Sequence, residues 1–340
     1  IQLARRDRGG GFNLMSFSLL LPLLAVLQRA AGPLNHVHAA DVMVVASGFS
    51  WAENMICVAE RKGAPAALYV TDNVRGELWR ISWDAAQKRY SQTLMEHLSS
   101  DFSLLSGLAT DVHTGQLFAA GNLNDGGDCV IVEVATDMAN TSSLAYQVRA
   151  HLPRRCLGGG LAVDENYFYM ASEGDFIPFN GKVFRIHRTT GYVETIVKNG
   201  IGDDGVWFDP QRGLLYVSEC ELGRAVVYNA SAQAMARTLN PQGYSIFLDD
   251  FMVDATGSTL IGADFSGGRV VAFDVQGPDE PPLTILLENV QNPTSVRSGC
   301  SEGDTTAGLG KRMLFVSEGG GSSGAQNRRI LAFMTPTAVA

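Results

Sequence analysis

One short pattern recurs six times along the chain and limits what it can fold into. Each copy begins with an apolar, β-rich run, turns through Gly, Asn or Asp, and returns with alternating apolar residues, as in "LYVTDNVRGELWRI" and "LIGADFSGGRVVAFD". This alternation around a turn is typical of a β-hairpin. The copies begin at Leu68, Leu117, Phe168, Leu215, Leu260 and Leu314, so successive starts are separated by 49, 51, 47, 45 and 54 residues.

The regular period predicts how the hairpins assemble. Units of 45–54 residues with several strands each are typical of a β-propeller. We therefore predict an all-β fold, a six-bladed β-propeller with four-stranded blades around a central channel. Neither a linker nor a shift in composition divides residues 41–340, so this range is expected to form a single domain. The 37 glycines agree with many short strands and turns.

The charge balance and the N-terminal segment limit the partners and the location. The formal net charge is −9 and no basic stripe is present, so no nucleic-acid partner is expected. From Met15 an apolar run of about ten residues leads into small residues that end at Ala40, as in a signal peptide. The run is too short to span a bilayer. We expect residues 1–40 to contain this signal peptide and the residues upstream of it. The mature protein should then be secreted or lie in the secretory-pathway lumen, with no membrane span after cleavage.

Sequons and cysteines agree with secretion. Asn140 and Asn229 begin Asn-x-Ser/Thr triplets and are candidate glycosylation sites. None of the five cysteines forms a CxxC pair, so a structural zinc site is not expected. One or two disulfides would form in an oxidising compartment, and at least one cysteine would be left over. A Cys57–Cys300 bond would tie the first and last parts of the fold, but the sequence leaves the connectivity open.

Residues at the head of each blade's first strand should meet at one mouth of the channel. Blade by blade these are Glu53, Ser106–Gly107, Gly158–Gly160, Asp203–Asp204, Asp249–Asp250 and Thr294–Ser295. Carboxylates from three blades would repel one another strongly, and they would need protons, cationic partners or a metal. Oxygen ligands from several segments suit Ca²⁺, although another divalent cation would also fit. We expect no Cys or His close enough to favour a softer metal.

One segment resembles a known family. "DDFMVDATGSTLIGADFSGGRVVAFDVQG", which starts at Asp249, is similar to the "DGM-x-x-D-x-x-G" blade of the regucalcin/gluconolactonase family of six-bladed propellers. The resemblance covers residues 47–334 and extends more distantly to diisopropyl fluorophosphatase and strictosidine synthase-like proteins. It implies that Asp249 binds the metal and serves as general base. It also implies that Glu53 and Asp204 complete the metal ligands, Asp204 replacing the family's Asn.

The substrate side departs from the family pattern. Gly159–Gly160 stand where the family has Asn-Asp, and Asn54 follows the first acid in place of Gly. The family's substrate arginine is not matched in place, but Arg155 lies close in sequence, and Ser295 lies in a Pro-Thr-Ser segment like that of the family. The resemblance thus implies Arg155 and Ser295 as substrate contacts.

Two functions remain open at this point. The resemblance implies calcium-dependent hydrolysis of a small-molecule lactone or ester. The run "LYVTD" at Leu68 also resembles the YWTD repeat of receptor propellers. The alternative is therefore a non-catalytic secreted propeller that binds Ca²⁺ structurally and engages a protein or ligand partner.

Overall fold

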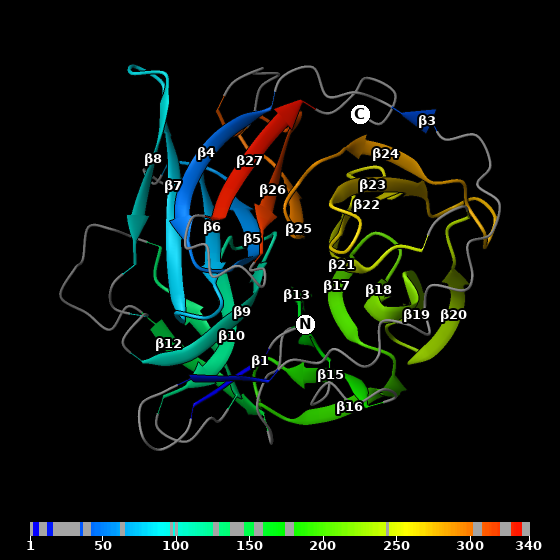
Figure 1. The fold of residues 1–340 in the computed structure, drawn as a ribbon. Coiled ribbons are helices and arrows are strands. Elements are labelled where there is room, and N and C mark those ends of the chain that lie inside the picture. The colour runs from blue at the N-terminus through cyan, green and yellow to red at the C-terminus, as the bar shows by residue number, and fades with distance from the viewer. Residues whose placement is uncertain are drawn as a thin grey trace.

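The fold is a ring of β-sheets. The computed structural model describes residues 3–6, 12–15, 35–36, 42–61, 65–95, 98, 101–124, 129–136, 146–152, 159–173, 180–242, 245–301, 308–319 and 328–334. Within them, six four-stranded antiparallel sheets surround one axis, and one of these sheets carries a short fifth strand (Figure 1). The predicted six-bladed β-propeller is confirmed.

Each blade is built from strands that follow one another in the chain. From the axis outward, the first three blades are β5 (Ala52–Val58), β6 (Ala67–Asp72), β7 (Glu77–Asp84) and β8 (Arg89–Leu94); β9 (Phe102–Thr110), β10 (Leu117–Leu123), β11 (Cys129–Val134) and β12 (Tyr146–Leu152); and β13 (Leu161–Val163), β14 (Tyr167–Ser172), β15 (Gly181–His187) and β16 (Val193–Gly200). The fourth and fifth are β17 (Asp203–Asp209), β18 (Leu214–Glu219), β19 (Arg224–Asn229) and β20 (Ala234–Leu239); and β21 (Leu248–Val253), β22 (Thr259–Asp264), β23 (Arg269–Asp274) and β24 (Thr284–Leu287).

The sixth blade closes the ring with a strand from the other end of the chain. β25 (Pro293–Ser298), β26 (Met313–Glu318) and β27 (Arg328–Met334) are followed outward by β4 (Met43–Phe49), which pairs antiparallel with β27. This pairing covers the outer edge of β27 and links the two ends of the ring, so the sixth blade has four strands like the others.

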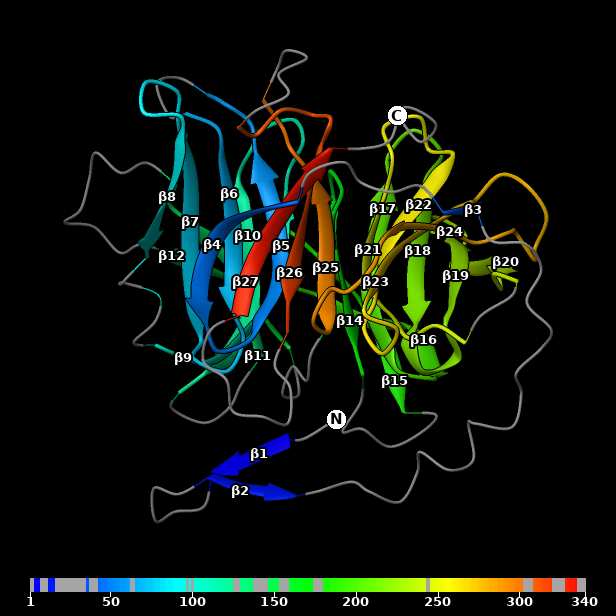
Figure 2. The same cartoon turned by 45° about the horizontal axis from the view of Figure 1, so that its top comes forward.

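Three short strands precede β4. β3 (Asn35–His36) pairs with β24 in parallel. β1 (Leu3–Arg6) and β2 (Phe12–Met15) form a separate two-stranded sheet outside the ring of blades (Figure 2). All three lie in the range expected to contain the signal peptide, and the removal of that range stays a prediction. Among the described residues, no helix combines the length and apolar character needed to cross a membrane.

The core lies between the blades. The described buried apolar residues form six clusters, each shared by two neighbouring blades. Phe118 of the second blade and Phe168 of the third meet edge to face with their ring centroids 4.9 Å apart. Because both faces of a blade are covered, the second strands β6 and β26 are buried along their whole length. These rigid sheets fix where the head of each first strand lies.

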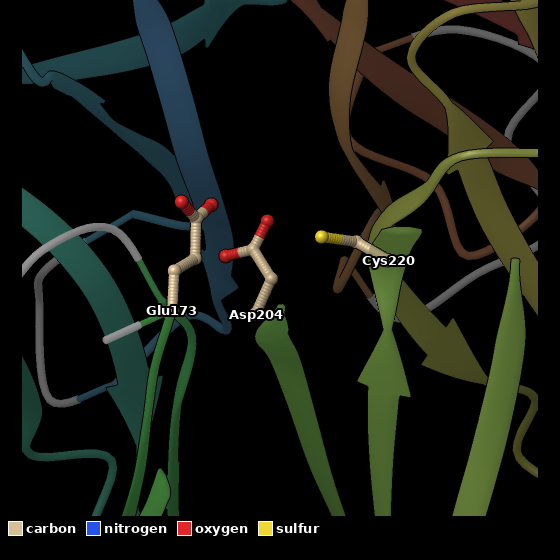
Figure 3. Close-up of side chains that lie close together, drawn as sticks. All are labelled: Glu173, Asp204 and Cys220. Carbon is tan, nitrogen blue, oxygen red and sulfur yellow. The ribbon is translucent and has the colours of Figure 1, made fainter. Parts of the chain in front are cut away.

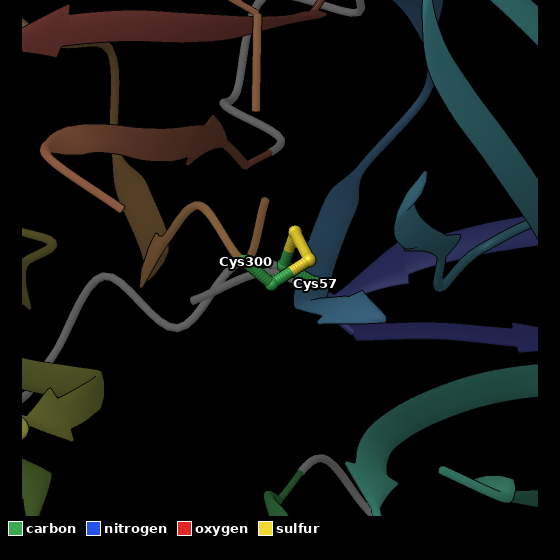
Figure 4. The surroundings of a disulfide bond; sticks show 2 residues. All are labelled: Cys57 and Cys300. Atoms are coloured by element: carbon green, nitrogen blue, oxygen red, sulfur yellow. A yellow bond between two sulfur atoms is a disulfide. The ribbon is translucent and has the colours of Figure 1, made fainter. Parts of the chain in front are cut away.

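A disulfide joins the first and last blades. Cys57 in β5 is bonded to Cys300, which follows β25, across a sequence separation of 243 residues (Figure 4). Cys129 is also disulfide-bonded. Cys220 is a free, buried thiol. The structure thus contains the bond that the sequence left open, and it leaves one thiol in the channel region.

Candidate metal centre

The first strands of five blades carry β-bulges. The residues left out of the pairing with the second strand are Glu53–Asn54 in β5, Ser106–Gly107 in β9, Asp204–Gly205 in β17, Asp249–Asp250 in β21 and Thr294 in β25. A bulge bends its strand and re-aims the side chains within it. The same local irregularity therefore directs the acidic residues of three blades out of the sheets.

A buried hydroxyl holds each of several bulges to the next blade. The Ser218 hydroxyl accepts a hydrogen bond from the Gly205 N–H at 2.7 Å and donates one to the Asp249 carbonyl at 2.8 Å. Ser317 links the sixth blade to the Glu53 carbonyl in the same way, at 3.0 Å. Thr71 does so between the first and second blades. The hydroxyls come from one position of the repeat, the fourth residue of "LYVTD", "LYVSE" and "LFVSE".

The bulges bring three carboxylates together. One oxygen each of Glu53, Asp204 and Asp249 lies within 4.8 Å of the other two. The three residues are buried, with relative exposures of 7%, 3% and 6%. Oxygens on opposite sides of a Ca²⁺ ion, bound at about 2.4 Å, are themselves about 4.8 Å apart. The spacing of this cluster fits that ion.

Burial and mutual repulsion raise the pKa values of these acids. Burial, and then the charge of Asp204, raises the pKa of Glu53 to about 8, although the Trp51 indole donates a hydrogen bond to its carboxylate. Burial raises the pKa of Asp204 to about 6, and burial together with the Asp204 charge raises the pKa of Asp249 well above its usual range. A bound cation would relieve this cost.

Asp249 retains a free ligand atom. Its Oδ1 is buried and has no hydrogen-bond partner among the described residues. Buried polar atoms are nearly always paired, so an unpaired carboxylate oxygen beside two other acids is available to coordinate a cation. The residues present therefore fit a hard divalent cation.

Asp250 has a different environment from its neighbour in the chain. Its Oδ2 accepts hydrogen bonds from the Ser295 hydroxyl at 2.8 Å and from Arg297 Nη2 at 2.6 Å. Arg297 is buried and also donates to the Phe251 carbonyl at 2.8 Å. The charge of Asp250 is thus balanced within the protein. Ser295, predicted to contact substrate, has its hydroxyl on Asp250, and its proposed role stays a prediction.

Two residues of the centre were not found from the sequence. Glu173 follows β14, Cys220 follows β18, and a ligand atom of each lies within 4.8 Å of the other and of an Asp204 oxygen (Figure 3). The expectation that no cysteine lies close enough to favour a softer metal is therefore wrong. The repeat held a signal for both, because Glu173 is five residues after Phe168 and Cys220 is five residues after Leu215.

The other predicted residues lie apart from the centre. Arg155 and Asn140 fall outside the described residues. Asn229 is exposed at the end of β19, and the Ser231 hydroxyl of its sequon donates to its Oδ1 at 2.8 Å. A cavity of about 360 Å³ is lined by the far ends of first strands, including Leu108, Trp207 and Arg297, and its lining includes none of the three clustered acids.

Comparisons with known proteins reveal the fold. No protein-family model and no curated protein matches the chain. A luciferin-regenerating enzyme matches with a TM-score of 0.60 at 14% identity, over 88% of this chain and 96% of that one. A putative gluconolactonase matches with a TM-score of 0.60 at 16% identity, over 87% and 92%. The calcium-binding protein regucalcin from Agrobacterium tumefaciens matches with a TM-score of 0.58 at 13% identity, over 88% and 95%. These similarities establish a shared propeller fold. They agree with the resemblance in the sequence.

Proposed function

We propose that this chain is a member of the regucalcin/gluconolactonase-like family and hydrolyses a small-molecule lactone or ester with the help of Ca²⁺ or another divalent cation. The observation that supports this best is the convergence of Glu53, Asp204 and Asp249, from three separate blades, on one buried point. A propeller that only presented its surface to a partner would not need to bury three mutually repelling acids, since each costs desolvation energy.

The acidic residues of the centre have different roles in the proposed hydrolysis. Glu53, Asp204 and Asp249 would hold the cation, which when bound supplies Lewis acidity toward the substrate carbonyl. Asp249 would also accept the proton of the attacking water as general base and pass it to the alkoxide oxygen that leaves the acyl carbon. The Ser218 hydroxyl fixes the Asp249 backbone through its carbonyl, and this keeps the base in one orientation.

A substrate panel tests the hydrolase. The purified chain is assayed against lactones and aryl esters with Ca²⁺ and with chelator, beside Asp249→Ala. Removal of a general base lowers turnover by about 10²- to 10⁴-fold. Asp279→Ala is the matched control, because the Asp279 side chain is 72% exposed, and it should retain full turnover. Full activity of Asp249→Ala, or equal rates with chelator, would refute the assignment. Stabilisation by Ca²⁺ without turnover of any substrate would instead favour the structural-cation alternative, a secreted binding propeller.

We also propose that the protein enters the secretory pathway, loses residues 1–40 and is glycosylated at Asn140 and Asn229. The Cys57–Cys300 disulfide supports an oxidising compartment. N-terminal sequencing and glycosidase treatment of the protein from secreting eukaryotic cells test this. The mature chain should start at residue 40 or 41 and should lose mass on treatment, whereas retention of residues 1–40 would contradict it.

A further inference from the structure

A second donor set overlaps the three carboxylates. Glu173, Asp204 and Cys220 each offer one ligand atom, and these atoms lie within 4.8 Å of one another. Figure 3 shows the Cys220 sulfur directed toward the Asp204 carboxylate, with the Glu173 carboxylate beside Asp204 on the other side. Asp204 belongs to both sets, so the two candidate positions are adjacent.

The fold holds Cys220 in this place. Cys220 is the first residue of η2 (Cys220–Leu222), directly after β18, and its backbone N–H donates to the Gly202 carbonyl at 3.0 Å. Gly202 has a φ of +64°, and a Cβ at this position would lie 2.7 Å from the Cys220 sulfur. Only glycine therefore fits at position 202 while the Cys220 sulfur stays in its present place. Cys220 is 1% exposed.

A separate observation supports a cation beside this set. The buried Oδ1 of Asp249 lacks a partner among the described residues, and a carboxylate oxygen of Asp249 lies within 4.8 Å of one of Asp204. A carboxylate oxygen without a donor therefore lies next to the ligand that both sets share.

The chemistry of the second set differs from that of the first. Three carboxylates form an oxygen-only site that suits a hard cation such as Ca²⁺. A thiolate with two carboxylates suits Zn²⁺, whose bonds to S and O are about 2.3 and 2.0–2.2 Å. Ligand atoms on one tetrahedral ion are then about 3.5 Å apart, so small side-chain rotations would close the present spacing.

We propose that Glu173, Asp204 and Cys220 form a thiolate-containing site for a thiophilic divalent cation such as Zn²⁺, next to the oxygen-only position. This inference rests on the proposal that the channel carboxylates hold a cation, but it does not depend on hydrolysis. It extends that proposal to a second class of metal ion, the thiophilic divalent cations, bound at the same end of the channel.

Cobalt and zinc titrations of the full chain test the site. Co²⁺ should produce a thiolate-to-metal charge-transfer band in the wild type, and Cys220→Ser should lack it. Among the described cysteines only Cys220 can supply the thiolate, because Cys57, Cys129 and Cys300 are disulfide-bonded. Loss of a zinc-site partner typically costs about 10- to 100-fold in affinity, so Cys220→Ser should lower the Zn²⁺ affinity at least about tenfold. Glu173→Gln, which keeps the thiol, should also weaken Zn²⁺ binding, and the exposed Asp279→Asn should not.

Further measurements keep this test separate from the hydrolase test. Cys220→Ser should keep wild-type Ca²⁺ binding at the oxygen-only set, which excludes misfolding as the cause of its lost band, and Glu53→Gln should retain the band. Absence of the band in the wild type, or equal Zn²⁺ affinity in Cys220→Ser and wild type, would overturn the inference. If that happens while wild-type turnover with Ca²⁺ persists, only the thiolate site fails. A Co²⁺ band without any Ca²⁺-dependent turnover would support the thiolate site and refute the proposed hydrolase activity.

Discussion

Asp249 and Asp250 are adjacent in β21 and carry the same side chain, but they have different partners. One oxygen of each lacks a partner among the described residues, but Asp250 Oδ2 accepts a hydrogen bond from Arg297, whereas Asp249 lies beside the carboxylates of Glu53 and Asp204. The repeat alignment could predict that Asp249 lies at the channel mouth. It could not predict the partner of Asp250, because Arg297 comes from another blade and is 47 residues away. Glu173 and Cys220 were missed for a related reason, since they follow second strands and only first-strand heads were considered.

The buried pair makes a prediction at the residue scale. Arg297→Met should destabilise the fold by about 3–5 kcal/mol, because it leaves the Asp250 carboxylate buried without its counter-charge. Arg149→Met is the control, since the side chain of Arg149 is 35% exposed and that of its partner Glu133 is 21% exposed. Such surface pairs contribute about 0–1 kcal/mol. Denaturant unfolding measures both variants. Similar losses of unfolding free energy in the two variants would show that the buried Arg297–Asp250 pair stabilises the fold no more than an exposed pair does.

At the element scale, acidic residues at the two ends of the first strands have different roles. At the far ends of four first strands lie Asp111, Asp164, Asp209 and Asp254, whose Oδ1 atoms accept backbone N–H groups of the following turn. These acids fix turns and lie away from the metal centre. The acids of the centre instead lie in bulges at the strand heads. Alternation of apolar residues predicts the strands, but a bulge adds one unpaired residue without altering local composition, so its position could not be derived.

The hydroxyl that joins two bulges can be tested directly. Ser218→Ala should cost about 1–3 kcal/mol, because it leaves the Gly205 N–H and the Asp249 carbonyl buried without this partner. It should also lower calcium affinity by about 10- to 100-fold, since the hydroxyl positions two metal-ligating segments. Ser91→Ala, at an exposed position of β8, should change neither quantity. Unfolding curves and calorimetry on both variants measure these effects. Wild-type stability in Ser218→Ala would contradict this role of the hydroxyl.

At the scale of the whole molecule, the period of the sequence predicts the number of blades and their order. It does not reveal that β4 completes the sixth blade, because this pairing joins residues near opposite ends of the chain. The Cys57–Cys300 bond reinforces the same closure. Ring closure fixes the strand heads relative to one another, so the stability of the ring and the geometry of the centre are coupled.

The raised pKa values of the buried acids predict how the free energy of unfolding varies with pH. In chelator, the raised pKa values of Glu53, about 8, and Asp204, about 6, mean that the folded chain binds more protons than the unfolded chain above about pH 4. Unfolding free energy should therefore fall as pH rises from about 4 to 8. Calcium, which binds the deprotonated acids, should stabilise the chain more at pH 8 than at pH 5.

Thermal unfolding at both pH values, with and without Ca²⁺, measures this dependence. Glu53→Gln, which cannot ionise, should show a flatter pH profile in chelator. A profile equal to that of the wild type would show that Glu53 is not the group responsible.

Calcium titration by calorimetry tests the central claim most directly. We expect the wild-type chain to bind Ca²⁺ through Glu53, Asp204 and Asp249, with the affinity lowered at least about tenfold in Asp249→Asn and unchanged in Asp279→Asn. If the wild type gives no calcium binding, or if Asp249→Asn binds as tightly as the wild type, the carboxylates of the channel do not form the proposed metal centre.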